Sequence, residues 1–191
     1  FESLDSFIKA LKRPRKVLLM LPSGEPIDKL IKDILPLLSE GDIILDGGNS
    51  HFENTEKRLS MLAKNKIRFL GVGISGGDQG ALKGPSLMVG GDKSAYKTVS
   101  KDLESIAAKN SYGGSCCEFL GSGGAGHYIK MIHNGIEYAE MQLICEVFEL
   151  SLISYSKNLI VIKKLFEKWQ KSRSESYLLD ITSKILAYED N

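Results

Sequence analysis

The hydrophobic pattern of the first 120 residues alternates between two periods. Short apolar runs bounded by glycine, proline or polar residues predict strands, and longer segments with apolar residues every three or four positions predict helices. Strands are expected at 16–21, 42–46, 67–73, 86–89 and 116–120. Helices are expected at 3–11, 26–38, 53–65 and 93–107. Strands that alternate with helices indicate an α/β fold with a mostly parallel sheet and right-handed crossovers.

The pattern changes at Gly126, after which helical periodicity continues with few breaks to Tyr188 and no strand-like run appears. We therefore expect a domain boundary near residue 125. Residues 1–125 are predicted to form an incomplete, Rossmann-like parallel sheet, and residues 126–191 the first helices of an all-α domain. The chain opens on a helical pattern without an initial methionine, so we expect that a preceding segment is missing.

Composition excludes several classes of protein. The 25 lysine and arginine residues balance 24 acidic residues, so no broad field favours nucleic acid or an anionic membrane. No apolar run approaches the roughly 20 residues of a membrane span. The three cysteines lack C-x-x-C spacing, which argues against a disulfide scaffold or a zinc site. A protein of the reducing cytoplasm is expected.

A glycine run at 121–126 matches G-x-G-x-x-G, the fingerprint of a dinucleotide-binding turn. That fingerprint belongs to the first strand–helix turn of a Rossmann unit, with a second strand and an acidic residue after it. Here the glycines follow the last predicted strand, and a helix comes next. We therefore favour a role in close packing beside the helix over a role in binding the cofactor's phosphates.

The helix after this run carries a polar stripe, because Lys130, His133, Asn134 and Glu137 fall at i, i+3, i+4 and i+7. The surrounding residues are mostly apolar, so the helix is expected to be well buried. A solvated face is the commoner explanation of such a stripe. The mixture of a base, an imidazole, an amide and an acid, with Gly135 among them, favours a functional face instead.

These residue types suit proton transfer. Burial disfavours the charged ammonium of a lysine, which would lower the pKa of Lys130 toward the range in which it accepts a proton from a hydroxyl group. Glu137, two turns away, could act as an acid in a second step. His133 and Asn134 could then orient hydroxyl or carboxylate oxygens. Metal binding is not expected, because no histidine or carboxylate cluster has ligand spacing.

Two further segments follow strands at the carboxyl edge of the sheet, where open α/β folds bind ligands. Ser75, Gly76 and Gly77 could present successive backbone N–H groups and a hydroxyl to a carboxylate, although an ordinary flexible loop would have the same composition. Asn49 could reach the same crevice, although by itself it suits a turn or a helix cap equally well.

Three stretches together resemble the 6-phosphogluconate dehydrogenase family. They are Leu45-Asp46-Gly47-Gly48-Asn49-Ser50, Gly73-Ile74-Ser75-Gly76-Gly77, and residues 126–138, GHYIKMIHNGIEY. The spacing from Gly121 through Gly124, Gly126 and Lys130 to Asn134 is similar to the catalytic signature of the wider β-hydroxyacid dehydrogenases. His133, Gly135, Glu137 and Tyr138 narrow the resemblance to the sugar-acid branch.

The resemblance implies NADP-dependent oxidation of 6-phosphogluconate at C3, followed by decarboxylation to ribulose 5-phosphate, by a homodimer. It implies that Lys130 is the base and that Glu137 protonates the enediol carbon. The positions implied to hold substrate are Asn49, Ser75, Gly76, Gly77, His133, Asn134 and Tyr138. Those implied to meet the cofactor are Asn49, Met20 and Leu21.

The chain also departs from the family. The first strand with its glycine turn, the arginine that selects the 2′-phosphate and later substrate-phosphate residues do not occur in it, and Pro22 stands where many members have lysine. We therefore expect little activity from the chain alone. Two rival hypotheses are a catalytically silent fragment that associates through its helices, and a dehydrogenase of simple hydroxy acids.

Overall fold

The computed structural model describes residues 1–188 and contains two compact units, the first comprising Phe1–Ile132 and the second beginning at His133. The strands of the first unit are β1 (Lys16–Leu19), β2 (Ile43–Asp46), β3 (Arg68–Ser75), β4 (Ser86–Gly91) and β5 (Cys117–Gly121). Its helices are α1 (Leu4–Ala10), α2 (Glu25–Ile34), the 3-10 turn η1 (Leu35–Leu37), α3 (Phe52–Ala63), α4 (Gly77–Lys83) and α5 (Lys93–Ile106). Helix α6 (Ala125–Ser154) begins in this unit, and α7 (Leu159–Gln170) and α8 (Tyr177–Ile185) belong to the second.

The five strands form one sheet in the order β1-β2-β3-β4-β5. β1, β2 and β3 are parallel neighbours, β4 runs antiparallel to β3, and β5 is parallel to β4. The predicted α/β class and mostly parallel sheet are therefore confirmed. Because β1, β2 and β3 point the same way, the segments that follow them meet at one edge of the sheet, which we call the carboxyl edge.

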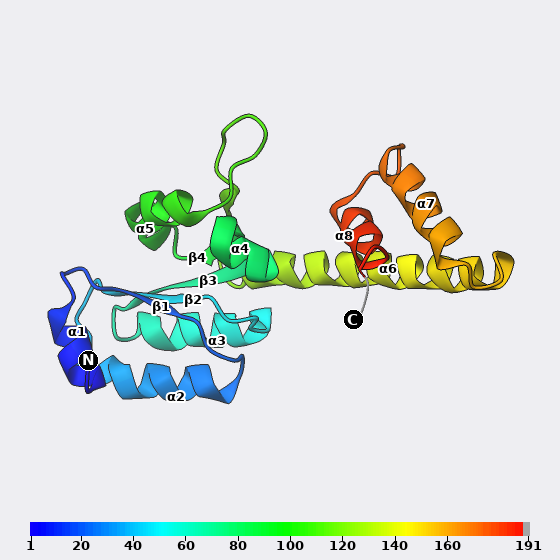
Figure 1. Cartoon of the computed structure of the whole chain (residues 1–191). Helices are drawn as coiled ribbons and strands as arrows, with labels where there is room; N and C mark the ends of the chain where they lie inside the picture. Colours follow the sequence, from blue (N-terminus) through cyan, green and yellow to red (C-terminus); the bar gives the residue numbers. More distant parts are fainter. Residues whose placement is uncertain (189–191) are drawn as a thin grey trace. The chain divides into compact units, whose positions relative to one another are not determined.

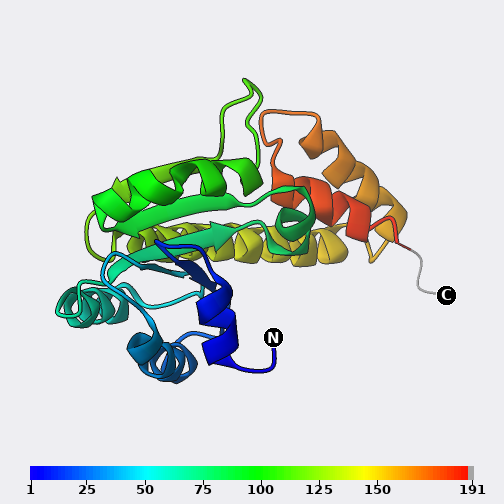
Figure 2. The same ribbon diagram turned by 90° about the vertical axis from the view of Figure 1, so that its left-hand side faces the viewer.

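Alternating side chains give the sheet two buried faces. On β2, Ile43 and Leu45 point into a core shared with α5, whereas Ile44 points into the core that α1, α2 and α3 form. Figure 1 shows α2 and α3 on one side of the strands and α5 on the other, and Figure 2 shows the same layers from a second direction. A strand that is buried on both faces needs the continuous apolar run that β2 has.

The sequence pattern missed helix α4, the seven residues Gly77–Lys83, which Gly76 separates from the end of β3. Gly77 and Gly80 lie within it, and glycine is among the poorest helix formers, so periodicity gave no signal. The backbone N–H of Gly80 nevertheless donates to the carbonyl of Gly76 at 2.7 Å. Gly76 and Gly77 also have positive φ angles of 143° and 54°, which glycine adopts without strain.

The second unit has a small core of its own. Ile162 and Phe166 of α7 and Leu179 of α8 are buried, and Phe148 of α6 packs against them. Asn158 caps α7 and Ser176 caps α8, each through a side-chain oxygen that accepts a backbone N–H. No helix among residues 1–188 is long and apolar enough to cross a membrane.

Candidate functional site

The glycine at position 126 allows the first turn of α6 to lie directly against the sheet. A Cβ atom on Gly126 would lie 2.4 Å from the carbonyl oxygens of Gly71 and Met88 and 2.6 Å from the nitrogen of Gly90. These contacts are all with backbone, which cannot move aside. The glycine run therefore permits close packing of α6, as the sequence analysis favoured.

Lys130 lies one turn further along α6, beside Gly73 of β3. A Cβ atom on Gly73 would lie only 2.5 Å from the Cβ of Lys130, so the lysine stem occupies the space that a side chain on the strand would need. The Lys130 side chain is buried, with 9% of the residue exposed. The predicted burial of this lysine is thus confirmed, and its place is near the carboxyl end of β3.

His127, at the start of the same helix, is buried against α3 and the end of β2. Its Nδ1 lies 2.6 Å from the Thr55 hydroxyl, and its Nε2 has no hydrogen-bond partner among residues 1–188. Burial lowers the pKa of His127, an effect that the nearby Asp46 carboxylate only partly opposes. The ring is therefore neutral near pH 7, and it links α6 to α3.

The loop after β2 presents Asn49 at the carboxyl edge. Gly48 and Ser50 on either side are buried, whereas Asn49 is exposed. A Cβ atom on Gly47 would lie 2.7 Å from the Met20 sulfur, and one on Gly48 would lie 2.8 Å from the Leu21 carbonyl oxygen. The structure therefore brings the three predicted cofactor residues together.

Asn49 is not a helix cap. The N-cap of α3 is His51, whose side chain accepts the Glu53 backbone N–H at 3.4 Å. Of the two alternatives to a functional role that the sequence left open for Asn49, only the turn agrees with this geometry.

Ser75, Gly76 and Gly77 follow Gly73 at the same edge. Ser75 ends β3 and is half-buried, and the two glycines at the start of α4 are exposed. A Cβ atom on Gly76 would lie 2.7 Å from the Cα of Gly80, so this turn is closed tightly by glycine. The predicted substrate loop is thus an exposed strand-to-helix turn.

The remaining predicted residues lie in the second unit, further along α6. His133, Asn134 and Glu137 are each half-buried, and Tyr138 is 63% exposed. His133 Nδ1 lies 3.3 Å from the Asn134 side-chain oxygen and 3.6 Å from the Glu137 carboxylate. The imidazole therefore interacts with both neighbours of the polar stripe.

The expectation that this helix is well buried was wrong for its apolar residues. Ile136 is 66% exposed, Leu143 61% and Leu150 62%. Of the described helices, α7 and α8 cover the face that contains Ile144 and Phe148, and these other apolar side chains remain uncovered. Periodicity identified the helix correctly but could not show which side has a partner.

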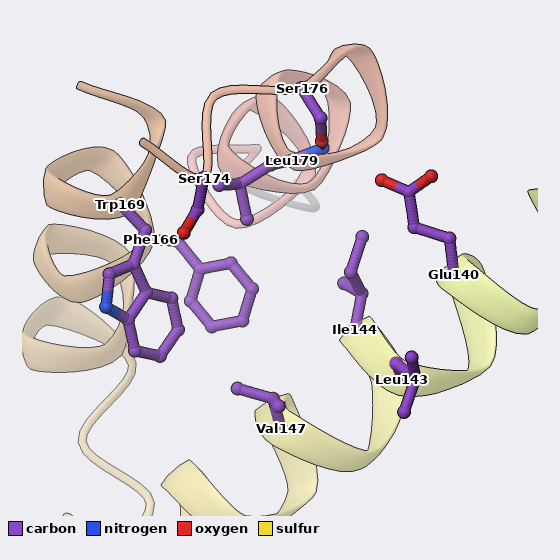
Figure 3. A pocket seen from close by; sticks show the side chains of 9 residues that line it. All are labelled: Glu140, Leu143, Ile144, Val147, Phe166, Trp169, Ser174, Ser176 and Leu179. Atoms are coloured by element: carbon purple, nitrogen blue, oxygen red, sulfur yellow. The ribbon is translucent and has the colours of Figure 1, made fainter. Parts of the chain in front are cut away.

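The second unit also contains an apolar groove of about 450 Å³ among α6, α7 and α8. Figure 3 shows the Glu140 carboxylate on the side of the groove opposite the Trp169 ring. The groove is lined by Glu140, Leu143, Ile144, Val147, Phe166, Trp169, Ser174, Ser176 and Leu179. It contains none of the predicted site residues.

Sequence reasoning missed a buried polar cluster beneath the carboxyl edge, of which Asp46, Arg58 and His127 are the ionisable members. Each partner comes from a different element, so no spacing in the sequence indicates it. Within the described range, residues 1–188, no group of three or more His, Cys, Asp or Glu side chains has the geometry of a metal site.

Comparison with known proteins relates both parts of the chain to one enzyme family. Residues 1–121 match the family model described as the NAD binding domain of 6-phosphogluconate dehydrogenase, and residues 126–191 match its C-terminal domain. A decarboxylating 6-phosphogluconate dehydrogenase of Saccharomyces cerevisiae is 48% identical over 98% of the chain and 38% of its own length. An NAD(+)-dependent, decarboxylating relative from Bacillus subtilis is 46% identical over the whole chain and 40% of its own length.

Among solved structures, Plasmodium falciparum 6-phosphogluconate dehydrogenase, described in its apo form and in complexes with NADP+ and with 6-phosphogluconate, superposes with a TM-score of 0.94. Its sequence is 38% identical, and the match covers the whole chain and 41% of that protein. The chain thus spans about two fifths of the length of these relatives. On this evidence, the chain belongs to the 6-phosphogluconate dehydrogenase family.

Proposed function

We propose that this chain acts within a longer 6-phosphogluconate dehydrogenase, which oxidises C3 of 6-phosphogluconate and decarboxylates the product to ribulose 5-phosphate. The observation that carries the proposal is the placement of Lys130, buried on α6 with its stem against Gly73 near the carboxyl end of β3. Residues 1–125 would form the dinucleotide-binding part, and residues 126–191 the start of the helical part. The two family models, which match residues 1–121 and 126–191, support this division.

Lys130 has the chemistry of the base. In its neutral form the amine accepts the proton of the C3 hydroxyl group while the C3 hydrogen leaves with its electron pair. Packing of the lysine stem against Gly73, which has no side chain, restricts the rotamers of Lys130 and so reduces the entropy lost in reaching the reactive position. The same ammonium group can then return a proton to the C3 oxygen while carbon dioxide leaves.

The substrate carboxylate would lie at the turn after β3. Ser75 offers a hydroxyl, and Gly76 and Gly77 are exposed, so a ligand can approach their backbone N–H groups closely. The hydroxyls of a sugar acid would meet an amide from Asn49 of the neighbouring loop. Helix α6 would add the imidazole of His133, the amide of Asn134 and the phenol of Tyr138. By the resemblance in sequence, these positions would hold the substrate.

The residues after β1 and β2 fit the nicotinamide end of a dinucleotide. Met20, which is 62% exposed, offers an apolar surface, and Asn49 beside it offers a carboxamide. When bound, the nicotinamide supplies the acceptor for the hydride. We propose NADP as the cofactor, with contacts from Met20, Leu21 and Asn49. The relative from Bacillus subtilis is NAD(+)-dependent, so NAD must be compared directly.

Glu137 is proposed to act after carbon dioxide has left, as the acid that protonates C1 of the enediol. It follows Lys130 by seven residues, about 10 Å of helix rise, so the two groups can address different carbons. Replacing Glu137 by glutamine keeps the volume but removes the transferable proton. Solvent-deuterium incorporation at C1 of ribulose 5-phosphate should then slow, while the affinities for substrate and cofactor change little. Unchanged turnover and C1 protonation would rule out this role.

The direct test uses the full-length enzyme that carries this sequence. Reduction of NADP and of NAD should be followed with 6-phosphogluconate and, for comparison, with a simple hydroxy acid such as 3-hydroxyisobutyrate. We expect reduction with 6-phosphogluconate, with equimolar carbon dioxide and ribulose 5-phosphate. Efficient oxidation of the simple hydroxy acid alone would refute the proposed substrate and favour the wider β-hydroxyacid branch.

We further propose that the enzyme is a cytoplasmic homodimer. The exposed apolar side chains of α6, among them Ile136, Leu143 and Leu150, support burial of this helix against other helices of the assembled enzyme. The 191-residue chain alone should bind NADP weakly, because the segment between β1 and α2 has one glycine, Gly24, and not the glycine-rich turn that brings cofactor phosphates onto a helix N-terminus. Saturable micromolar binding in a fluorescence titration with NADPH would contradict this.

A further inference from the structure

Arg58 lies beneath the carboxyl edge and joins the segments that follow β1 and β2. Its side chain is 3% exposed, and its donors point in three directions. Nε donates to the Asp28 carboxylate at 2.7 Å, and Nη2 donates to the Gly24 carbonyl at 3.2 Å. Nη1 donates to Asp46 and to the Ser50 hydroxyl, each at 3.0 Å.

Asp46 carries this connection into the loop that contains Asn49. Its fully buried carboxylate accepts the Gly48 backbone N–H at 3.0 Å and the Ser50 hydroxyl at 2.7 Å, besides the bond from Arg58. The residues on both sides of Asn49 are therefore tied to one carboxylate. Asn49 itself, between them, faces outward.

Stability alone does not account for this arrangement. A buried ion pair often contributes no more to folding than apolar side chains of the same size, because desolvation of both charges offsets their attraction. What a guanidinium adds is geometry, since its planar fork directs several bonds at fixed angles. At Arg58 those bonds reach α2 and its preceding turn on one side and the Asn49 loop on the other.

We propose that Arg58 is a positioning residue, which fixes the Asn49 loop relative to the segment after β1 and so holds the Asn49 carboxamide where cofactor and substrate meet. It acts through Asp46 and Ser50 and touches neither ligand. The inference rests on the proposed function for its catalytic consequence, although the loop geometry it describes can be measured without any activity.

The test is a double-mutant cycle in the full-length enzyme that carries this sequence. Arg58→Lys keeps the charge and removes the fork, so kcat/KM should fall about 10-fold, as expected for a modest misplacement of a reactive group. If Arg58 acts through Asn49, Arg58→Lys should lower kcat/KM by less than about 2-fold when Asn49 is already replaced by alanine. Equal losses in both backgrounds would show a merely structural role and overturn the proposal.

Arg68→Lys is the matched control. Arg68 also donates to a backbone carbonyl, that of Gly41, but at the amino end of the strands. Its replacement should leave kcat/KM within about 2-fold of the unchanged enzyme, as is usual for a change away from the site. If Arg58→Lys fails to fold, Ser50→Ala takes its place in the test, because it removes only the hydroxyl that bridges Arg58 and Asp46. This variant should lower kcat/KM by a smaller factor than Arg58→Lys.

Amide hydrogen exchange on the 191-residue chain separates this inference from the proposed function. The Gly48 N–H, which donates to Asp46, should exchange at least about 10-fold faster in Arg58→Lys, whereas Val72 in the centre of β3 should be unchanged. Unchanged protection of Gly48 would overturn the positioning role. If the full-length enzyme did not oxidise 6-phosphogluconate, the proposed function would fail and the exchange result would still decide the role of Arg58.

Discussion

The same substitution at two glycines of α6 should have opposite effects on stability. In Gly126→Ala the new methyl group would lie 2.4 Å from two carbonyl oxygens and 2.6 Å from a backbone nitrogen. Overpacking usually costs about 1–3 kcal/mol, and here three rigid backbone atoms must move, so we expect roughly 3 kcal/mol or more. At Gly135 no atom of residues 1–188 outside the adjacent backbone of its own helix lies within 4 Å of the added methyl group. Alanine there should stabilise the helix by about 0.8–1.0 kcal/mol, the difference in helix propensity.

Urea denaturation of the 191-residue chain measures both effects. Trp169, the single tryptophan, lies in the second unit with Gly135, so its fluorescence reports that unit, while far-UV circular dichroism reports both. In thermal denaturation followed by circular dichroism, Gly126→Ala should lower the melting temperature by roughly 6–12 °C, as expected for a loss of about 3 kcal/mol in a protein of this size. A shift of both variants in the same direction, or a Gly126→Ala protein within about 0.5 kcal/mol of the original, would refute the close packing of α6 on the sheet.

Three further predictions concern buried side chains. Gly73→Ala should displace Lys130, whose Cβ would lie 2.5 Å from the new methyl group, and kcat of the full-length enzyme should fall about 100-fold; near-normal turnover would contradict the contact. Burial lowers the pKa of His127 from 6.5, so protonation of its ring favours the unfolded state. The free energy of unfolding should therefore be highest above pH 6.5 and should fall as the pH drops below that value. Melting temperatures between pH 5 and 8 should show this slope, and His127→Gln should flatten it. Asp42→Ala should cost about 3–5 kcal/mol in urea denaturation, because it leaves Arg15 buried without its carboxylate partner; a cost below about 1 kcal/mol would show that Arg15 is solvated.

The sequence was most informative where one period dominates a segment. β2 is apolar at every position but its last, and α5 has apolar residues at regular helical spacing, so both were predicted within a few residues. The antiparallel direction of β4 was not predictable, because strand direction depends on pairing with β3 and not on local composition. Helix α4 was missed for the related reason that its glycines have a low helix propensity and the tertiary fold stabilises it.

At the site, sequence reasoning found the residues that lie in recognisable motifs and missed the buried residues that support them. Asn49 and Lys130 lie in motifs that point to chemistry, whereas Arg58 and His127 look like ordinary helix residues until their partners from other elements are known. The glycines of β3 are a sequence signal of the contact with α6. Gly71 and Gly73 alternate on β3, and glycine at every second position leaves one face of a strand open to the close approach of a helix.

The central claim is that Lys130, held against Gly73, is the base that starts oxidation of the substrate. The most direct measurement is kcat for NADP reduction by the full-length enzyme with 6-phosphogluconate, compared between the original sequence and Lys130→Ala, together with the deuterium isotope effect at C3. Loss of the base should lower kcat by about 10²–10⁴-fold while substrate affinity changes much less. A Lys130→Ala enzyme that transfers hydride at a near-normal rate would contradict the account.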